Sequence, residues 1–267
     1  MHKTILITGS TDGIGLETAK ALLNLGHKVL IHGRNQTKLE TLQGQLAKQF
    51  GQDQVQAWAA DLSHLDEVRS LAQRIAESGV RIDVLINNAG VFKVQPTQTD
   101  SGMDVRFVVN TIAPWLLTRL LLPALATDAR VINLSSAAQA PVNLAALRGE
   151  MPVSDDFSAY AQSKLALTMW SMEPARLGLT DEQSMVAVNP GSLLGSKMVR
   201  EGFGTQGHDI GIGVRILSKL ALEPDAVQSA CYFDNDAGHY ADPHVSALDG
   251  TVRSALCDVV EQLAAAD

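Results

Sequence analysis

The sequence predicts an α/β fold in which a doubly wound parallel sheet of about seven strands carries helices on both faces. Short β-branched or apolar runs alternate with longer segments of helical periodicity, as in repeated βαβ units. A glycine-rich turn follows the first of these runs and leads into a helical segment. No internal repeat or long polar linker interrupts the alternation, so residues 1–267 are expected to form a single domain.

The expected strands are short, and six of them are clear: 4–8, 27–33, 55–60, 83–88, 130–135 and 184–189. The expected helices between them carry apolar residues at three- and four-residue spacing: 14–25, 36–50, 63–78, 103–126 and 157–173. Pro174 should end or bend the last of these. The tail 252–267 predicts a final amphipathic helix with Leu256, Val259, Val260 and Leu263 on one face.

Composition excludes several classes of function. The chain of 267 residues is 46% hydrophobic and carries a formal net charge of −8, so an extended nucleic-acid-binding surface is not expected. Cys231 and Cys257 lie far apart and belong to no Cys/His cluster, so neither a metal site nor a disulfide framework is predicted.

Membrane and targeting segments are not expected either. Met1-His2-Lys3 leads directly into the first apolar run, without the pattern of a signal peptide, and a cytoplasmic protein is predicted. The run 112–126 contains Arg119 and two prolines and is shorter than a membrane span of ~20 residues. It is therefore interpreted as a buried helix.

The segment "TGSTDGIG" at 8–15 predicts a binding site for phosphate. Gly9, Gly13 and Gly15 are spaced GxxxGxG, which differs from the commoner GxGxxG pattern. Glycines allow a tight strand-to-helix turn and close backbone approach, and the N–H groups at a helix N-terminus suit a pyrophosphate. Glycines that serve only the tight turn are the alternative interpretation.

Tyr160 and Lys164 stand four residues apart in a segment of helical character, so their side chains share one face. A nearby cation favours phenolate, and we expect Lys164 to lower the pKa of Tyr160. The alternative is a packed tyrosine beside a solvated lysine.

These segments belong to an ordered series of motifs. "TGSTDGIG" is followed by Asp61-Leu62 after the third strand, "NNAG" at 87–90, Asn110, "SS" at 135–136, "YAQSK" at 160–164 and "NPG" at 189–191. In this order, along nearly the whole chain, they resemble the short-chain dehydrogenase/reductase family. The resemblance implies a Rossmann fold and an oxidoreductase that uses a nicotinamide cofactor.

The same resemblance assigns catalytic roles. Tyr160 would exchange a proton with the oxygen of a carbonyl or alcohol, and Lys164 would also bind the ribose hydroxyls of the cofactor. Ser136 would hold the substrate oxygen; Ser135 is its neighbour, and only one of the two can face the site. Asn110 would interrupt its helix and hold a water of the proton relay.

The resemblance also implies a set of cofactor-binding positions. They are Gly9, Ser10, Thr11, Asp12, Gly13, Ile14, Gly15, Arg34, Asp61, Leu62, Asn87, Ala89, Gly90, Tyr160, Lys164, Pro190, Gly191 and Leu193. Asp61 would accept a hydrogen bond from the adenine amino group, although an aspartate at this point could equally cap the following helix.

The end of the second strand, "VLIHGRN", favours NADP(H) over NAD(H). Gly33 occupies the position where NAD-binding proteins carry an acid, and Arg34, next to it, can grip a 2′-phosphate. Asp12 argues against NADP(H), because some NADP-dependent relatives carry a basic residue at this position. A solvated loop arginine is the alternative for Arg34.

Two departures bear on the substrate. Twenty-four positions separate Ser136 from Tyr160, a long spacing that is similar to the branch with retinol dehydrogenases and protochlorophyllide reductases. The segment 192–213 offers Leu193, Leu194, Met198, Val199, Phe203 and Ile210 between glycines. It is interpreted either as an apolar cover that closes on a lipophilic substrate or as a surface helix with core anchors.

The leading hypothesis is an NADP(H)-dependent oxidoreductase that interconverts a carbonyl compound (an aldehyde or a ketone) and an alcohol. A non-catalytic NAD(P)-binding redox sensor is the alternative. A nucleotide-sugar epimerase or dehydratase is disfavoured, because no large C-terminal substrate domain follows. The resemblance also implies a homodimer or homotetramer through helices 103–126 and 157–173.

Overall fold

A computed structural model describes residues 2–266, and it contains one sheet with the strand order β3-β2-β1-β4-β5-β6-β7-β8. Seven strands are parallel, and β8 pairs antiparallel with β7. The strands are β1 (Thr4–Ile7), β2 (Lys28–Gly33), β3 (Val55–Ala59), β4 (Ile82–Asn87), β5 (Leu125–Leu134), β6 (Ser184–Asn189), β7 (Cys231–Asp234) and β8 (His239–Tyr240). The order confirms the predicted doubly wound sheet.

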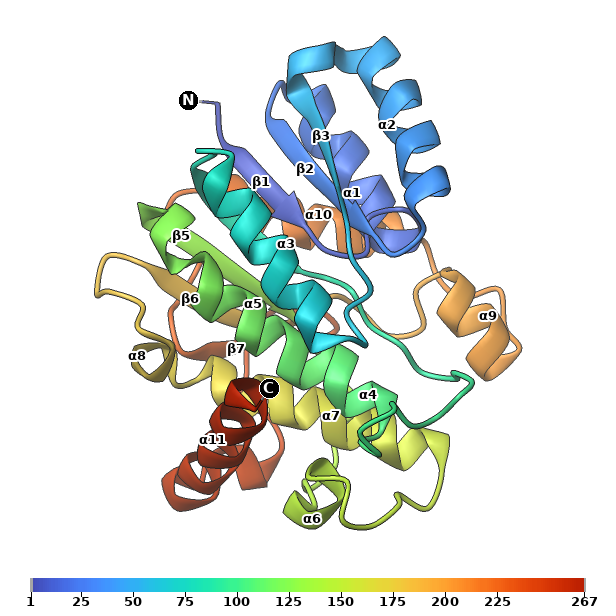
Figure 1. Ribbon diagram of the computed structural model, residues 1–267, viewed down its shortest axis with the longest axis vertical. Helices are drawn as coiled ribbons and strands as arrows, with labels where there is room; N and C mark the ends of the chain where they lie inside the picture. Colours follow the sequence, from blue (N-terminus) through green and yellow to red (C-terminus); the bar gives the residue numbers. More distant parts are fainter. Residues whose placement is uncertain (1, 267) are drawn as a thin grey trace.

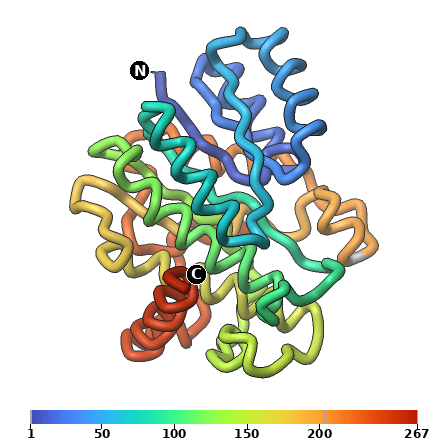
Figure 2. The backbone as a smooth tube through the Cα atoms, in the orientation of Figure 1, coloured from blue at the N-terminus to red at the C-terminus, as the bar shows by residue number. Residues whose placement is uncertain are grey.

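Helices cover both faces of the sheet (Figure 1). One core cluster joins it to α1 (Gly13–Asn24), α2 (Gln36–Phe50) and α10 (Gly211–Leu222). The other joins it to α3 (Leu65–Glu77), α5 (Ala113–Leu121), α7 (Asp156–Ser171) and α11 (Gly250–Ala265). The tube in Figure 2 follows the same crossovers from the N-terminal half to the C-terminal half of the sheet. Shorter elements are α4 (Val105–Phe107), α6 (Leu144–Leu147), α8 (Pro174–Leu177), α9 (Lys197–Phe203), η1 (Gln52–Gln54), η2 (Val108–Ile112), η3 (Leu122–Ala124) and η4 (Val245–Ala247).

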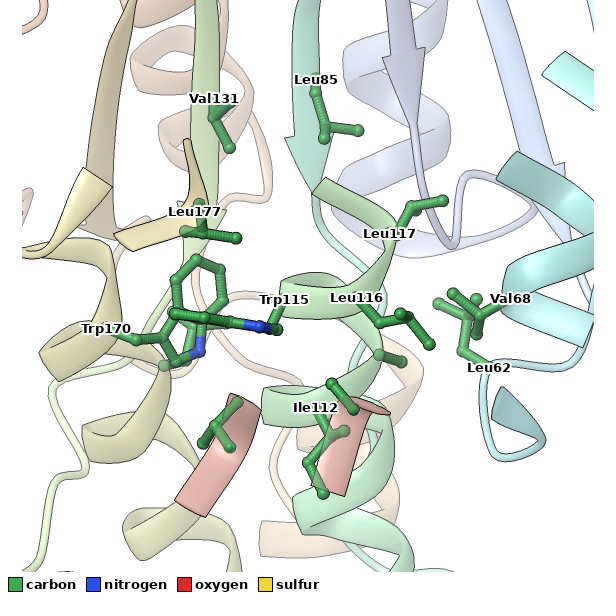
Figure 3. Close-up of a cluster of buried hydrophobic side chains, with 14 of the residues drawn as sticks. Leu62, Val68, Leu85, Ile112, Trp115, Leu116, Leu117, Val131, Trp170 and Leu177 are labelled. Atoms are coloured by element: carbon green, nitrogen blue, oxygen red, sulfur yellow. The ribbon is translucent and has the colours of Figure 1, made fainter. Parts of the chain in front are cut away.

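The two cores follow from the period of two along each strand. Ile5 and Ile7 pack on the side of α1, whereas Leu6 between them packs on the side of α3 and α5. On this second side Trp115 and Trp170 meet edge to face with centroids 5.6 Å apart (Figure 3). Their contact joins α5 to α7, so the helix that carries Tyr160 is fixed to the core.

The predicted helix 103–126 is divided into four short elements. η2 is a π-helical turn that contains Asn110, between α4 and α5. In a regular α-helix the carbonyl of Asn110 would accept from the N–H of residue 114, and residue 114 is a proline. The interruption at Asn110 therefore has a cause in the sequence, and π turns are frequent at functional sites.

The stretch Val105–Ala124 is long and apolar enough to cross a membrane by length and composition. However, 78% of its most apolar window is buried within the fold, where it packs against α3 and α7. This agrees with the interpretation of the run as a buried helix.

The C-terminal helix α11 packs against α7 and α5, the two helices expected to face a partner subunit. Leu256, Val259 and Val260 are buried there, and Arg119 of α5 donates to Glu261 at 2.7 Å. The homodimer or homotetramer stays a prediction. α7 ends at Ser171, three residues before Pro174, and this end was predicted.

Candidate active site

A cavity of about 820 Å³ opens at the carboxyl ends of the strands. It lies where the strand order reverses between β1 and β4, the usual position of ligand sites in such sheets. Most predicted site residues line it: Gly9, Thr11, Asp12, Gly13, Ile14, Arg34, Asp61, Leu62, Ala89, Gly90, Tyr160, Lys164 and Pro190.

Other predicted cofactor contacts lie outside the wall of the cavity. Ser10 is fully buried, and its hydroxyl accepts from the backbone N–H of His32 at 2.9 Å. Asn87 is also buried and donates to Thr118 and Asn133. Gly15, Gly191 and Leu193 are absent from the described lining, and Leu193 is 41% exposed. Ser10, in the loop after β1, and Asn87, the last residue of β4, thus use their side chains on protein partners and support the wall from behind.

The glycine loop is shaped for a close approach of backbone. Gly9 and Gly13 have φ values of 64° and 57°, the left-handed region that favours glycine. A Cβ at Gly9 would lie 2.8 Å from Cα of Ala89, and one at Gly15 would lie 2.4 Å from Nδ2 of Asn88. Asp12 accepts from the N–H of Gly13 at 2.7 Å and caps α1. A bare loop at the start of a helix fits a pyrophosphate.

His32 supports this loop, and sequence reasoning missed it. Its Nδ1 accepts from the N–H of Gly9 at 3.1 Å. Burial lowers the pKa of His32 to about 4, so the ring is neutral near pH 7 and keeps Nδ1 as an acceptor. The only signal in the sequence was a histidine inside an apolar strand, opposite the first loop.

The residues that follow β2 in the wall of the cavity include two cations. A Cβ at Gly33 would lie 2.5 Å from Cγ2 of Thr11, so this position is closed to a carboxylate side chain. Arg34 lines the cavity, and so does Lys38, which sequence reasoning missed. Nζ of Lys38 lies 3.9 Å from Oδ2 of Asp12 and offsets the acid in the glycine loop. These residues fit a ribose that carries a phosphate.

Asp61 belongs to the turn before α3, and its contact with adenine stays a prediction. Its Oδ1 accepts from the N–H and the hydroxyl of Ser63, at 2.9 and 2.7 Å, so it forms the turn before α3. Although burial acts to raise it, these hydrogen bonds and Arg34 hold the pKa of Asp61 below its usual value. The carboxylate also lines the cavity and remains ionised there.

Tyr160 and Lys164 face the cavity together. Nζ of Lys164 lies 5.7 Å from the centroid of the Tyr160 ring and donates to the carbonyl of Leu134 at 2.8 Å. Lys164 is 4% exposed, and burial lowers its pKa to about 8.

The predicted lowering of the Tyr160 pKa by Lys164 is wrong for the protein without ligand. Burial raises the pKa of the phenol, and contact with the Ser136 hydroxyl only partly opposes this. The ammonium donates to Leu134, and in this arrangement its charge does not offset the effect of burial on the neutral phenol.

The two neighbouring serines have different tasks. Ser135 is buried, and its hydroxyl lies 2.5 Å from the hydroxyl of Thr168, a residue of α7. Ser136 places its hydroxyl beside Tyr160, where it also accepts from the N–H of Ala138 at 3.1 Å. Ser135 is counted in the wall of the cavity and Ser136 is not, but the hydroxyl in contact with Tyr160 is that of Ser136.

Asn110 uses its side chain to join three segments. Its Oδ1 accepts from the N–H of Val91 at 2.8 Å, and its Nδ2 donates to the carbonyl of Val91 and to Ser163, both at 2.9 Å. These bonds fix the segment after β4 against α7. The side chain is thereby engaged with protein groups, and its predicted role in holding a water stays a prediction.

Comparisons with known proteins agree with this arrangement. The family model for short chain dehydrogenase matches residues 3–207. Human polyprenol dehydrogenase is 36% identical over 195 residues, which cover 70% of this chain and 58% of that protein. Mouse retinol dehydrogenase 14 is 37% identical over 191 residues, 66% of this chain and 57% of that protein. The chain thus matches little more than half the length of these curated relatives.

Solved structures are similar over most of the chain. A protein from Mycobacterium paratuberculosis has a TM-score of 0.79 at 27% identity, covering 98% of this chain and 93% of that one. A protein from Escherichia coli CFT073, described as a short chain dehydrogenase and complexed with NADPH, has a TM-score of 0.69 at 26% identity, covering 87% and 96%. With the motifs and the retinol and polyprenol dehydrogenase relatives, these matches show that the chain belongs to the short-chain dehydrogenase/reductase family of oxidoreductases.

Proposed function

We propose that this protein is an NADP(H)-dependent oxidoreductase that interconverts a lipophilic aldehyde or ketone and its alcohol, with Tyr160 as general acid/base. One observation carries the proposal: the glycine loop with Arg34 and the pair Tyr160–Lys164 line the same cavity. One end of this cavity suits a phosphorylated nucleotide, and the other carries a proton donor.

The residues that would hold the cofactor follow from the fit of the cavity. The glycine loop and the N-terminus of α1 would bind the pyrophosphate, and Arg34 with Lys38 would bind the 2′-phosphate. Asp61 would accept from the adenine amino group, and Lys164 would donate to the ribose hydroxyls. The NADPH complex of the similar Escherichia coli protein supports this choice. When bound, the cofactor supplies or accepts the hydride at the reacting carbon.

In the direction of reduction, the hydroxyls of Tyr160 and Ser136 both donate to the carbonyl oxygen and so orient it. Tyr160 then transfers its proton to that oxygen as negative charge develops. Because burial keeps the phenol protonated near pH 7, it is ready to act as an acid. Lys164 stabilises the phenolate that remains, and in the direction of oxidation the phenolate takes the proton back.

A lipophilic substrate is supported by the walls around Tyr160. Phe92 packs against the phenol, and the apolar side chains Val91, Val94, Val105, Val109 and, from α9, Met198 line the same cavity. Apolar walls exclude water from the proton transfer. The retinol and polyprenol dehydrogenase relatives support the same substrate class.

The test is NADPH consumption with aldehydes and ketones of graded length and polarity. Tyr160→Phe should reduce turnover at least ~10³-fold while NADPH still binds. Tyr240→Phe is the matched control, because this tyrosine donates to Ala226 and does not line the cavity. NADPH binding without turnover of any carbonyl or alcohol would favour the redox sensor.

A further inference from the structure

Phe92 lies beside the phenol and is held from several sides. It follows the "NNAGV" motif after β4, is 5% exposed, and lines the cavity. The centroid of its ring is 5.2 Å from that of Tyr160, with an angle of 59° between the planes. Phe157, in the first turn of α7, packs edge to face against the Phe92 ring, with the two centroids 6.5 Å apart. The side of the phenol toward α9 is therefore covered by an aromatic ring.

Gly202 in α9 closes on this ring. A Cβ at Gly202 would lie 2.5 Å from Cδ1 and 2.6 Å from Cε1 of Phe92, so the backbone of α9 touches the ring directly. Figure 1 shows α9 next to the segment that follows β4. The approach requires a residue without a side chain, because any Cβ would push the ring or the helix away.

The segment that carries α9 is tied at its base. The N–H of His208 donates to the carbonyl of Leu193 at 2.7 Å, and the N–H of Gly195 donates to that of His208 at 2.8 Å. Leu194 is 3% exposed and anchors this base in the core. Because these hydrogen bonds hold the ends of the segment together and Gly202 lies against the Phe92 ring, α9 limits the space into which this ring can turn.

We propose that Phe92 is a specificity-determining residue of this site. Its ring restricts the room at the carbon next to the reacting carbonyl, so the site accepts linear carbonyl compounds and rejects those with a branch at that carbon. Gly202 is the positioning residue that holds the ring in place. This inference rests on the proposed function, since it concerns the same carbonyl and the same phenol.

The first test compares octanal with 2-ethylhexanal, which has as many carbons but a branch next to the carbonyl. Wild type should prefer octanal, measured as the ratio of the two kcat/KM values. Phe92→Ala should lower this ratio at least about tenfold by admitting the branched aldehyde, the size of effect expected from pocket shape. An unchanged ratio in Phe92→Ala would overturn the inference.

The second test separates the ring from its support. Gly202→Ala keeps the ring, and alanine is the better helix former, so a harmful effect has to come from the contact with Phe92. We expect kcat/KM for octanal to fall about tenfold in the wild-type background and less than twofold in the Phe92→Ala background. Gly44→Ala is the matched control, because Gly44 lies within α2 with nothing within 4 Å of an added Cβ.

Hydrogen exchange of residues 197–203 gives a readout besides activity. In the NADPH complex, Gly202→Ala should raise exchange of these amides relative to wild type and Gly44→Ala. Equal exchange and equal kinetics in both variants would overturn the role of Gly202. If wild type reduced no carbonyl at all, the proposed function would fail and the specificity role with it; turnover with an unchanged ratio would remove the specificity role alone.

Discussion

The ammonium of Lys164 donates to the carbonyl oxygen of Leu134 at 2.8 Å, while the centroid of the Tyr160 ring lies 5.7 Å away. Leu134 is the last residue of β5, so the sheet itself determines where the charge of α7 is held. The cation is thus tied to the backbone in the wall of the cavity. One consequence can be measured directly, namely how activity depends on pH.

The first prediction concerns Lys164. Because burial lowers its pKa to about 8, the free enzyme should lose this charge above pH 8 instead of near 10.5. In reduction, kcat/KM should therefore be level below pH 8 and then fall about tenfold per pH unit. The measurement is a profile of kcat/KM from pH 6 to 10, with enzyme stability checked at each pH. A level profile up to pH 10 would contradict the assignment.

The second prediction concerns Arg34. Arg34→Ala should weaken NADPH binding roughly 10- to 100-fold, as loss of a bidentate phosphate contact implies, and change NADH binding little. Lys38→Ala should produce a smaller loss in the same direction. Titration calorimetry with both cofactors measures this. Arg81→Ala is the control, since Arg81 lies at the opposite ends of the strands, just before β4. Equal losses for NADPH and NADH would exclude a 2′-phosphate contact.

The third prediction concerns His32. Its pKa is about 4 in the fold and 6.5 when unburied, so between these pH values the unfolded chain binds more protons than the folded one. The contribution of the neutral His32 ring to the free energy of unfolding should therefore be fully present above pH 6.5. It should fall by about 3 kcal/mol as the pH drops to 4.

His32→Asn removes the titrating ring and can keep an acceptor for Gly9 through its Oδ1. Urea unfolding at several pH values should then show a smaller loss of stability between pH 6.5 and 4 than in wild type. Parallel curves for the two proteins would show that other groups cause the acid loss.

The fourth prediction concerns Asn110. Asn110→Ala leaves the part-buried N–H and carbonyl of Val91 without their side-chain partner, at a cost on the order of 2 kcal/mol in the free energy of unfolding. Activity should fall as well, because Val91 precedes Phe92 and follows Gly90, and all three line the cavity. Asn24→Ala, at the exposed end of α1, is the control and should change stability by less than ~0.5 kcal/mol. A loss of that small size in Asn110→Ala would exclude the structural role.

The doubly wound sheet could be predicted from the sequence because its signals are local. Buried strands show as short β-branched runs, and the crossover helices show as three- and four-residue spacing. β7 and β8 were missed as individual strands since their runs are four and two residues long. The interruption of the helix at Asn110 was expected from the family resemblance, and Pro114, which supplies no N–H four positions later, is consistent with it.

Of the site, the sequence determined which residue types are available and their order along the chain: the glycine loop, Arg34, Ser136, Tyr160 and Lys164. Only the tertiary structure decided the electrostatics and the supporting contacts. The pKa of Tyr160 depends on burial by remote segments, and His32, Phe92 and Gly202 gain their roles from contacts between distant parts of the chain. Periodicity is encoded between near neighbours, whereas desolvation and close packing arise where segments far apart in sequence meet.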